Sequence, residues 1–347
     1  MRPGALVLFG SGETAAVGRE ALRWLRASGR EPRAVAVLET PAGFEPNAAA
    51  VAARWARTLA RQTELRGAVF EQVPARRRGT PFTPDDPIIA RPILGADLVV
   101  LGAGSPSYAV RQLRGSVTWS SAQAAHLLGA SLLLASAAAI ATGTCALPVY
   151  EIYKVGEDPH WNDGLRLFEL YGLALAVVTH WDNSEGGEGL DTSRCYMGEE
   201  RFRELMERLP AGVVVVGIDE HTALAVDPAT ARADVLGRGG VTLIRDGRET
   251  TFERGASLAL AELGPFALAD VDGVVAAKAR AAVEEARAAR QTARPPAEVA
   301  ALVATRARAR ADRDFAVADR LRDEIAERGW DVEDTPAGTR VLPRRAG

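Results

Sequence analysis

The chain has few cysteines, and it has no long apolar run. Two cysteines occur in 347 residues, Cys145 and Cys195, so a disulfide framework is not expected and a reducing compartment fits. No apolar run reaches the ~18–20 residues that span a membrane. The first residues, MRPGALVLFG, lead directly into a strand pattern and lack the layout of a signal peptide. We therefore expect a cytoplasmic protein with no membrane partner.

A strong charge of either sign is also missing. The net charge is −3, which gives no general attraction to nucleic acid or to membrane surfaces. Residues 276–347 carry 15 Lys and Arg against 12 Asp and Glu, a net charge of +3, and residues 1–275 carry 27 against 33, a net charge of −6. The C-terminal surplus is too small to establish nucleic-acid binding by electrostatics alone.

Short apolar runs alternate with helical patterns along the first 180 residues. The strands predicted from these runs are residues 5–9, 34–39, 68–73, 97–102, 131–135 and 173–178. This alternation predicts an α/β fold with a mostly parallel, doubly wound sheet. Residues 148–156 and 213–218 are predicted to be further strands, and residues 222–254 an antiparallel continuation of the sheet.

Ligands of such sheets bind beyond the carboxyl ends of the strands. Three loops rich in glycine, serine or small residues follow predicted strands there, at residues 10–14, 102–107 and 135–138. The third loop contains Ser136, which stands between an apolar strand and an alanine-rich helix start. Strand, serine and helix form the layout of a nucleophile elbow. The structural alternative is a buried strand that leads into a buried helix, because Leu134 and Ala138 occupy positions where an elbow prefers glycine.

A serine nucleophile needs a base and a group that orients the base. His180 lies in the loop after the predicted strand 173–178 and is the first candidate for the base, with His221 as its rival. The sequence leaves several acids open as the third group, and these are Glu151, Glu157, Asp158 and Asp182. His126 and His160 are interpreted as structural. Cys145 is a weaker alternative nucleophile, because it follows the predicted helix instead of the turn.

No tight spacing of metal ligands occurs in these loops. We therefore predict neither a metal site nor a cofactor. The substrate expected for a serine hydrolase of this kind is a peptide or a small amide, and a homodimer is a further expectation.

The C-terminal part of the chain has a different composition. Residues 275–291 form a predicted alanine- and arginine-rich helix, and the prolines at 295–296 interrupt it. The rest reads as a helical hairpin with a short two-stranded tail. We therefore predict three parts: an α/β domain over 1–265, a helical linker over 266–295, and a small helical hairpin domain over 296–347.

The first 260 or so residues resemble the peptidase S51 family, which includes dipeptidase E and cyanophycinase and has a fold like that of class I glutamine amidotransferases. The similar pieces are residues 102–106 with 110–113, Ser136-Ala137-Ala138-Ala139, Thr179-His180-Trp181, and Arg194 with the helix start at 200–205. The resemblance implies that Ser136 is the nucleophile and His180 the base. Family members place an acid roughly fifteen residues after the serine, which implies Glu151 as the third member.

In that assignment Gly104, Ser105 and Ala137 offer backbone N–H groups to the oxyanion, and Arg194 belongs to the substrate loop. The chain is then a serine-type peptidase or hydrolase. The alternative is an inactive α/β binding protein, because the elbow lacks its usual glycines.

The last ~50 residues resemble the C-terminal anticodon-binding tail of cysteinyl-tRNA synthetase. The similar residues are 310–324, Gly329, and the turn Asp334-Thr335-Pro336-Ala337-Gly338-Thr339 with the residues before it. The ATP-binding signatures of a synthetase are absent from the sequence. The resemblance implies a module that faces tRNA through residues 296–347, or a helical hairpin reused for contact with a protein.

Overall fold

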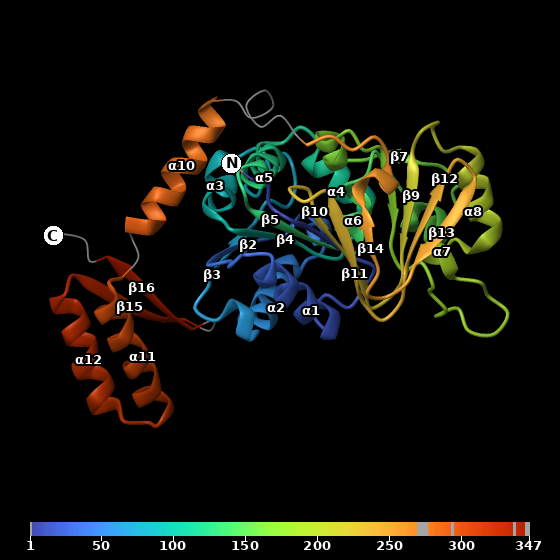
Figure 1. The fold of residues 1–347 in the computed structure, drawn as a ribbon. Helices are drawn as coiled ribbons and strands as arrows, with labels where there is room; N and C mark the ends of the chain where they lie inside the picture. Colours follow the sequence, from blue (N-terminus) through green and yellow to red (C-terminus); the bar gives the residue numbers. More distant parts are fainter. Residues whose placement is uncertain (1, 269–276, 293–294, 336–337, 344–347) are drawn as a thin grey trace. The chain divides into compact units, whose positions relative to one another are not determined.

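The computed structural model describes residues 2–268, 277–292, 295–335 and 338–343, and it divides into two compact units, Met1–Val283 and Glu284–Gly347 (Figure 1). The predicted α/β class is confirmed. The linker expected over 266–295 includes residues that lie outside the described ranges, so the predicted domain bounds stay a prediction.

The first unit contains an eight-stranded sheet with the strand order β14-β11-β10-β1-β5-β4-β2-β3. Its parallel strands are β1 (Leu6–Phe9), β2 (Ala34–Leu38), β3 (Val69–Val73), β4 (Leu98–Leu101) and β5 (Ser131–Ala135). Its antiparallel strands are β10 (Thr222–Asp227), β11 (Arg232–Gly237) and β14 (Ser257–Ala259). In the register, Phe9 pairs with Ala135 and Leu101 with Leu134. The parallel strands therefore end at one common edge.

Helices cover both faces of this sheet (Figure 1). The helices α1 (Ala16–Ala27) and α2 (Ala48–Ala60) pack on one face, where Leu22 and Leu59 join the buried cluster around Val7. The other face carries α3 (Pro87–Gly95), α4 (Pro106–Leu113), α5 (Val117–Leu127) and α6 (Ala137–Ala141). Each set buries apolar residues on one side of its helices, as amphipathic helices do.

A second sheet of six strands, in the order β13-β12-β9-β8-β6-β7, shares the core of the second face. Its strands are β6 (Cys145–Ala146), β7 (Asn162–Asp163), β8 (Leu175–Val178), β9 (Val214–Ile218), β12 (Val241–Arg245) and β13 (Arg248–Phe252). The prediction of one continuous sheet is therefore wrong: β10, β11 and β14 extend the first sheet, whereas β12 and β13 extend the second.

The strand predicted over 148–156 is also absent. Residues Glu151–Val155 form a single π-helical turn, η3, that ends at Gly156 in a left-handed conformation. Val149 and Ile152 are buried while Val155 is 73% exposed. The two buried side chains are three positions apart, which suits a helical turn and not the two-residue alternation of a strand.

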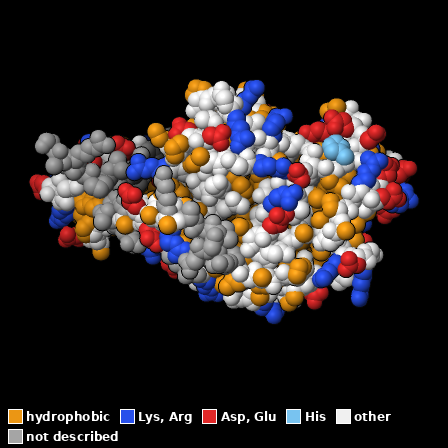
Figure 2. All heavy atoms as spheres, turned by 90° about the horizontal axis from the view of Figure 1, so that it is seen from above, with side chains coloured by type: hydrophobic (Ala, Val, Ile, Leu, Met, Phe, Trp, Pro, Cys, Tyr) orange, Lys and Arg blue, Asp and Glu red, His pale blue; other side chains and the backbone are white. Residues whose placement is uncertain are grey.

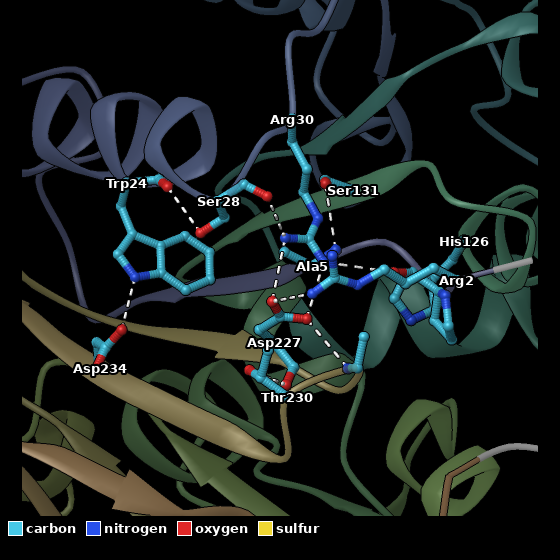
Figure 3. Close-up of polar contacts among 12 residues, drawn as sticks. Arg2, Ala5, Trp24, Ser28, Arg30, His126, Ser131, Asp227, Thr230 and Asp234 are labelled. Atoms are coloured by element: carbon cyan, nitrogen blue, oxygen red, sulfur yellow. Dashed lines mark hydrogen bonds and ion pairs between the residues drawn. The ribbon is translucent and has the colours of Figure 1, made fainter.

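A network of ion pairs and hydrogen bonds closes the edge of the first sheet at which β1 begins (Figure 3). Arg30 donates to both carboxylate oxygens of Asp227, at 2.8 and 3.2 Å, and the indole of Trp24 donates to Asp234 at 2.7 Å. Asp227 ends β10, which runs antiparallel to β1, so this network lies at the edge opposite the ends of the parallel strands. Its carboxylates already have partners, and we assign it a structural role.

The second unit consists of two helices and a β-hairpin around a small core. The helices are α11 (Ala297–Ala311) and α12 (Phe315–Glu327), and the strands are β15 (Trp330–Thr335) and β16 (Gly338–Pro343). Val299, Ile325 and Trp330 form the core. Helix α10 (Ala277–Thr292) precedes them in the sequence.

A buried arginine holds the helices to the hairpin of this unit. The side chain of Arg306 is 1% exposed and makes two hydrogen bonds, of 2.9 and 2.7 Å, to the carboxylate of Asp334. Thr339 and Arg310 also contact this carboxylate. The hydrogen bonds from Arg306 keep the pKa of Asp334 far below its usual range. The turn that carries the sequence resemblance therefore has a structural function in this unit.

None of the helices in the described ranges is long and apolar enough to cross a membrane. Figure 2 shows basic and acidic side chains interspersed on the face that it presents, with hydrophobic side chains between them. This distribution agrees with the small net charge of the sequence.

Candidate active site

Ser136 lies at the sharp turn between β5 and α6. Its backbone has φ 49° and ψ −113°, a region that residues with a side chain rarely adopt and that costs about 1–3 kcal/mol. The turn is held because the N–H of Ser136 donates to the carbonyl of Phe9 and its carbonyl accepts from Ile140. Leu134 and Ala138 are both buried at this turn, so it forms although the two glycines typical of an elbow are missing.

Three side chains form a continuous hydrogen-bonded row at this turn. The Oγ of Ser136 lies 3.0 Å from Nε2 of His180, and Nδ1 of His180 lies 2.9 Å from Oε1 of Glu220. Because the carboxylate accepts from Nδ1–H, the lone pair of Nε2 is free to accept the serine proton. His180 lies two residues beyond the end of β8 and also has a positive φ, of 51°.

The carboxylate of Glu220 is itself oriented by neighbouring groups. Asn183 donates to the same oxygen, Oε1, at 3.0 Å, and the backbone N–H of Glu220 donates to Asp182 at 2.7 Å. Partial burial alone raises the pKa of Glu220, but the hydrogen bonds from His180 and Asn183 outweigh it and lower this pKa. Glu220 therefore stays ionised near neutral pH and can stabilise a positive charge on His180.

Glu151, the acid implied by the family spacing, does not hydrogen-bond to His180. It begins the turn η3, and its Oε2 is buried without a hydrogen-bond partner among the described residues. The third member of the row is Glu220 instead. A signal for it was present in the sequence: Glu220 follows strand 213–218, and neighbouring parallel strands bring their carboxyl ends together. β8 and β9 are such neighbours.

The expected oxyanion donors differ in their availability. The N–H of Ser105 donates to the carbonyl of Pro41, and its hydroxyl accepts from Tyr108 at the start of α4. The prediction for Ser105 is therefore wrong, because its N–H is already engaged. Ala137 is the first residue of α6, and the first N–H groups of a helix have no acceptor within it. A Cβ on Gly104 would lie 1.8 Å from the carbonyl oxygen of Pro41, so this loop requires glycine. Ala137 and Gly104 stay predictions.

Arg194 packs against Trp181, the residue that follows His180. Its guanidinium carbon lies 4.1 Å from the centroid of the buried Trp181 ring. Its backbone N–H donates to the carbonyl of Trp181, and that of Cys195 donates to His180. Residues Arg194, Cys195 and Tyr196 all have positive φ values, so α7 (Ser193–Tyr196) is a left-handed turn. A role of Arg194 toward substrate stays a prediction.

The alternative groups do not contact Ser136 through any hydrogen bond of the described residues. The backbone N–H of His221 donates to Ser11 instead. Burial raises the pKa of the Cys145 thiol, which disfavours the nucleophilic thiolate. His126 is buried between Ala130 and Tyr171, and His160 bonds to the carbonyl of Asp158. In the described part of the chain, no group of three or more His, Cys, Asp or Glu side chains is arranged to hold a metal ion.

Comparison with known proteins separates the chain into two parts. Residues 292–341 match the family described as the cysteinyl-tRNA ligase anticodon binding domain. A cysteine–tRNA ligase of Burkholderia lata is 50% identical over 52 residues, which are 15% of this chain and 11% of that protein. The enzyme of Alkalilimnicola ehrlichii is 65% identical over 43 residues, 12% of this chain and 9% of its own length. The chain thus spans only about a tenth of the length of these curated relatives.

The α/β part is similar in fold to a solved peptidase. The crystal structure of a peptidase from an acI-B1 Actinobacterium superposes with a TM-score of 0.58 and 21% identity, over 74% of this chain and 97% of that one. The α/β part therefore has the fold of a known peptidase structure, as the sequence predicts. It is followed in the chain by the segment that matches the anticodon binding domain.

Proposed function

We propose that the chain is a serine-type hydrolase of the S51 kind, which cleaves a peptide or amide bond through Ser136, His180 and Glu220. The observation that carries the proposal is the row of hydrogen bonds of 3.0 and 2.9 Å that joins these side chains. The strained turn at Ser136 and the ionised state of Glu220 support it. The fold of the solved peptidase agrees with it, but the fold alone does not assign an activity.

The chemistry follows from the row. As Ser136 attacks the carbonyl carbon, His180 accepts the hydroxyl proton at Nε2, and Glu220 stabilises the resulting imidazolium. His180 then donates this proton to the leaving amine, and the acyl group stays on Ser136. Water, deprotonated by His180, hydrolyses the acyl-enzyme. In this proposal, the first N–H groups of α6, which have no acceptor within the helix, stabilise the oxyanion.

A fluorophosphonate probe tests this proposal without knowledge of the substrate. We expect the wild-type chain to be labelled and the Ser136→Ala and His180→Ala variants to be unlabelled. A Ser193→Ala variant is a matched control, because Ser193 is a described serine outside the row, and we expect it to label like the wild type. Equal labelling of the Ser136→Ala variant, or no labelling of a folded wild-type chain, would contradict the proposal and favour a catalytically inactive binding protein.

We further propose that the second unit binds tRNA. The support is the match of residues 292–341, the exposed arginines Arg308, Arg313 and Arg320, which make no ion pair within the described residues, and the 56% exposed ring of Phe315. The guanidinium groups suit phosphate contacts, and the ring suits base stacking. Filter binding of tRNA to the full chain tests this at several salt concentrations. An Arg308→Glu, Arg320→Glu variant should bind more weakly with a shallower salt dependence, and equal binding by wild type and variant would refute it.

A further inference from the structure

An arginine–aromatic surface, made of Phe44, Phe82, Tyr108, Arg77 and Arg111, lies on the first unit. These residues come from segments that follow β2, β3 and β4. Because β5, β4, β2 and β3 are parallel neighbours in this order, the segments that follow them share one edge of the sheet with Ser136. The surface is therefore on the same edge as the proposed nucleophile.

Three aromatic rings are assembled on this surface. The rings of Phe44 and Tyr108 meet edge to face at 5.2 Å, and the hydroxyl of Tyr108 donates to the carbonyl of Arg76. The guanidinium of Arg76 lies 4.2 Å from the centroid of Phe82. Phe44 and Phe82 nevertheless remain 48% and 42% exposed. Two large, partly exposed rings provide platforms on which unpaired bases stack.

The basic groups on this surface are only partly neutralised. Arg76 pairs with the buried Glu39, and Arg78 pairs with Asp85 at 3.3 Å. Arg77 and Arg111 are exposed and make no ion pair within the described residues. Arg111 lies 5.3 Å from the centroid of Tyr108, so one free cation is fixed directly beside the rings. Free guanidinium groups next to exposed rings match a ligand that alternates phosphates with bases.

A cavity of about 320 Å³ is lined by residues of α2 and of the segments that follow β1, β2 and β4, and one of them, Glu39, pairs with Arg76 beside this surface. Its lining includes Glu39, Arg54, Trp55, Gly102 and Ala103. The benzene edge of Trp55 packs where Gly102 has no Cβ, and the indole N–H is buried without an acceptor in the described part of the chain. The volume is at the lower end of that of small-ligand pockets, about 300–1,000 Å³, and suits one nucleoside. A bound acceptor would also satisfy the indole N–H.

We propose that this surface and cavity hold the unpaired 3′ end of an aminoacyl- or peptidyl-tRNA, and that the bond presented to Ser136 is the ester to the terminal ribose. The inference rests on the proposed serine-hydrolase function. Ser136 Oγ forms a bond to the ester carbonyl carbon, and the bond from that carbon to the ribose oxygen breaks. His180 passes the serine proton to the ribose oxygen. Water then releases the amino acid or peptide and restores Ser136. The tRNA-binding proposal for the second unit is an independent reason for tRNA to be the partner.

The test is deacylation of a total tRNA pool charged with radiolabelled amino acids, by the full chain and its variants. Wild type should release the label, and Ser136→Ala should not. An Arg77→Glu, Arg111→Glu variant should lose about 10- to 100-fold in kcat/KM, as expected when contacts to charged groups are removed. Its matched control is Arg248→Glu, Arg254→Glu, which makes the same change of charge at two exposed sites, in β13 and in the turn after it, and should behave as wild type.

Binding of single-stranded RNA by Ser136→Ala variants gives a second measurement. Phe44→Ala or Phe82→Ala should weaken binding by about 5- to 150-fold, the factor expected for one lost base stack. Fluorophosphonate labelling of the wild type and of each variant that keeps Ser136 reports the state of the row of Ser136, His180 and Glu220. A chain that labels normally but deacylates no faster than Ser136→Ala overturns this inference and leaves the hydrolase proposal standing. A folded wild-type chain that does not label overturns both. Normal deacylation by the Arg77→Glu, Arg111→Glu variant overturns the assignment of the surface.

Discussion

The structure makes Glu220, and not Glu151, the acid that supports His180, and the substitution Glu220→Gln tests this directly. Glutamine keeps the size of the side chain and removes its charge. It also places an NH₂ group where a carboxylate oxygen accepts from His180 Nδ1. If that NH₂ donates to Nδ1, the ring proton moves to Nε2, which then cannot accept the proton of Ser136.

The size of the effect follows from the geometry. Two unit charges 2.9 Å apart attract each other by about 6 kcal/mol at an effective dielectric constant of about 20. The side chains of His180 and Glu220 are 21% and 28% exposed, so solvent screens part of this attraction. We therefore take the screened attraction between the two charges to be about 3 kcal/mol. Since 1.36 kcal/mol corresponds to a tenfold rate, loss of the charge slows the reaction about 100-fold. Reversal of the tautomer extends this toward about 10⁴-fold.

The assay is the second-order rate constant for labelling by a fluorophosphonate, which needs no substrate. We expect Glu220→Gln to slow labelling by about 10²- to 10⁴-fold. Glu151→Gln is the matched control, since it makes the same chemical change at a residue with no hydrogen bond to His180, and it should stay within about threefold of wild type. Far-UV circular dichroism verifies folding. Slow labelling by Glu151→Gln, or wild-type labelling by Glu220→Gln, would refute the assignment.

Three further predictions concern stability. Burial lowers the pKa of His126 from 6.5 to about 4. The stability that the neutral, buried His126 contributes is therefore complete above pH 6.5 and is lost as the pH falls toward 4. Denaturant titration should show a free energy of unfolding about 2 kcal/mol lower at pH 5 than at pH 7 from this group, and His126→Asn should reduce this difference. Asp334→Ala leaves the buried Arg306 unpaired and should destabilise the second unit by about 3–5 kcal/mol, which differential scanning calorimetry measures; an unchanged transition would contradict the structural role of this pair. A Cβ on Gly217 would lie 2.3 Å from the Trp181 ring beside His180, so Gly217→Ala should lower both the melting temperature and the labelling rate, and wild-type values for both would show that the ring is free to move.

The sequence was most informative where a local pattern determines the local structure. The run Ser131–Ala135 is a strand with the predicted bounds, because the apolar stretch and the turn at Ser136 act over a few residues. The partner of His180 was missed for the opposite reason. Glu220 is 40 positions away from His180, and only the pairing of β8 with β9 brings the two together.

The error at residues 148–156 has a different origin. This segment contains several β-branched and aromatic residues, which favour strands. Tertiary packing outweighs this preference, because a helical turn is the conformation in which both Val149 and Ile152 are buried. The division into two sheets could not be predicted from the sequence either, because the local pattern of residues 222–254 is the same whichever sheet its strands join.

In the row of Ser136, His180 and Glu220, Ser136 follows a strand of the first sheet, His180 follows a strand of the second, and Glu220 lies in the connection between the two sheets. The chain leaves the first sheet just after Ser136, on its way through α6 to β6, and returns to it through residues 219–221 between β9 and β10. At the return, Gly10 has no room for a Cβ, which would lie 2.0 Å from the carbonyl oxygen of Asp219. Both crossings therefore adjoin the reactive groups, and any sliding of one sheet over the other changes the Ser136–His180 distance. The reactivity of Ser136 should therefore depend strongly on how the two sheets are aligned. Under pressure or mild denaturant, we expect this reactivity to fall before the secondary structure is lost.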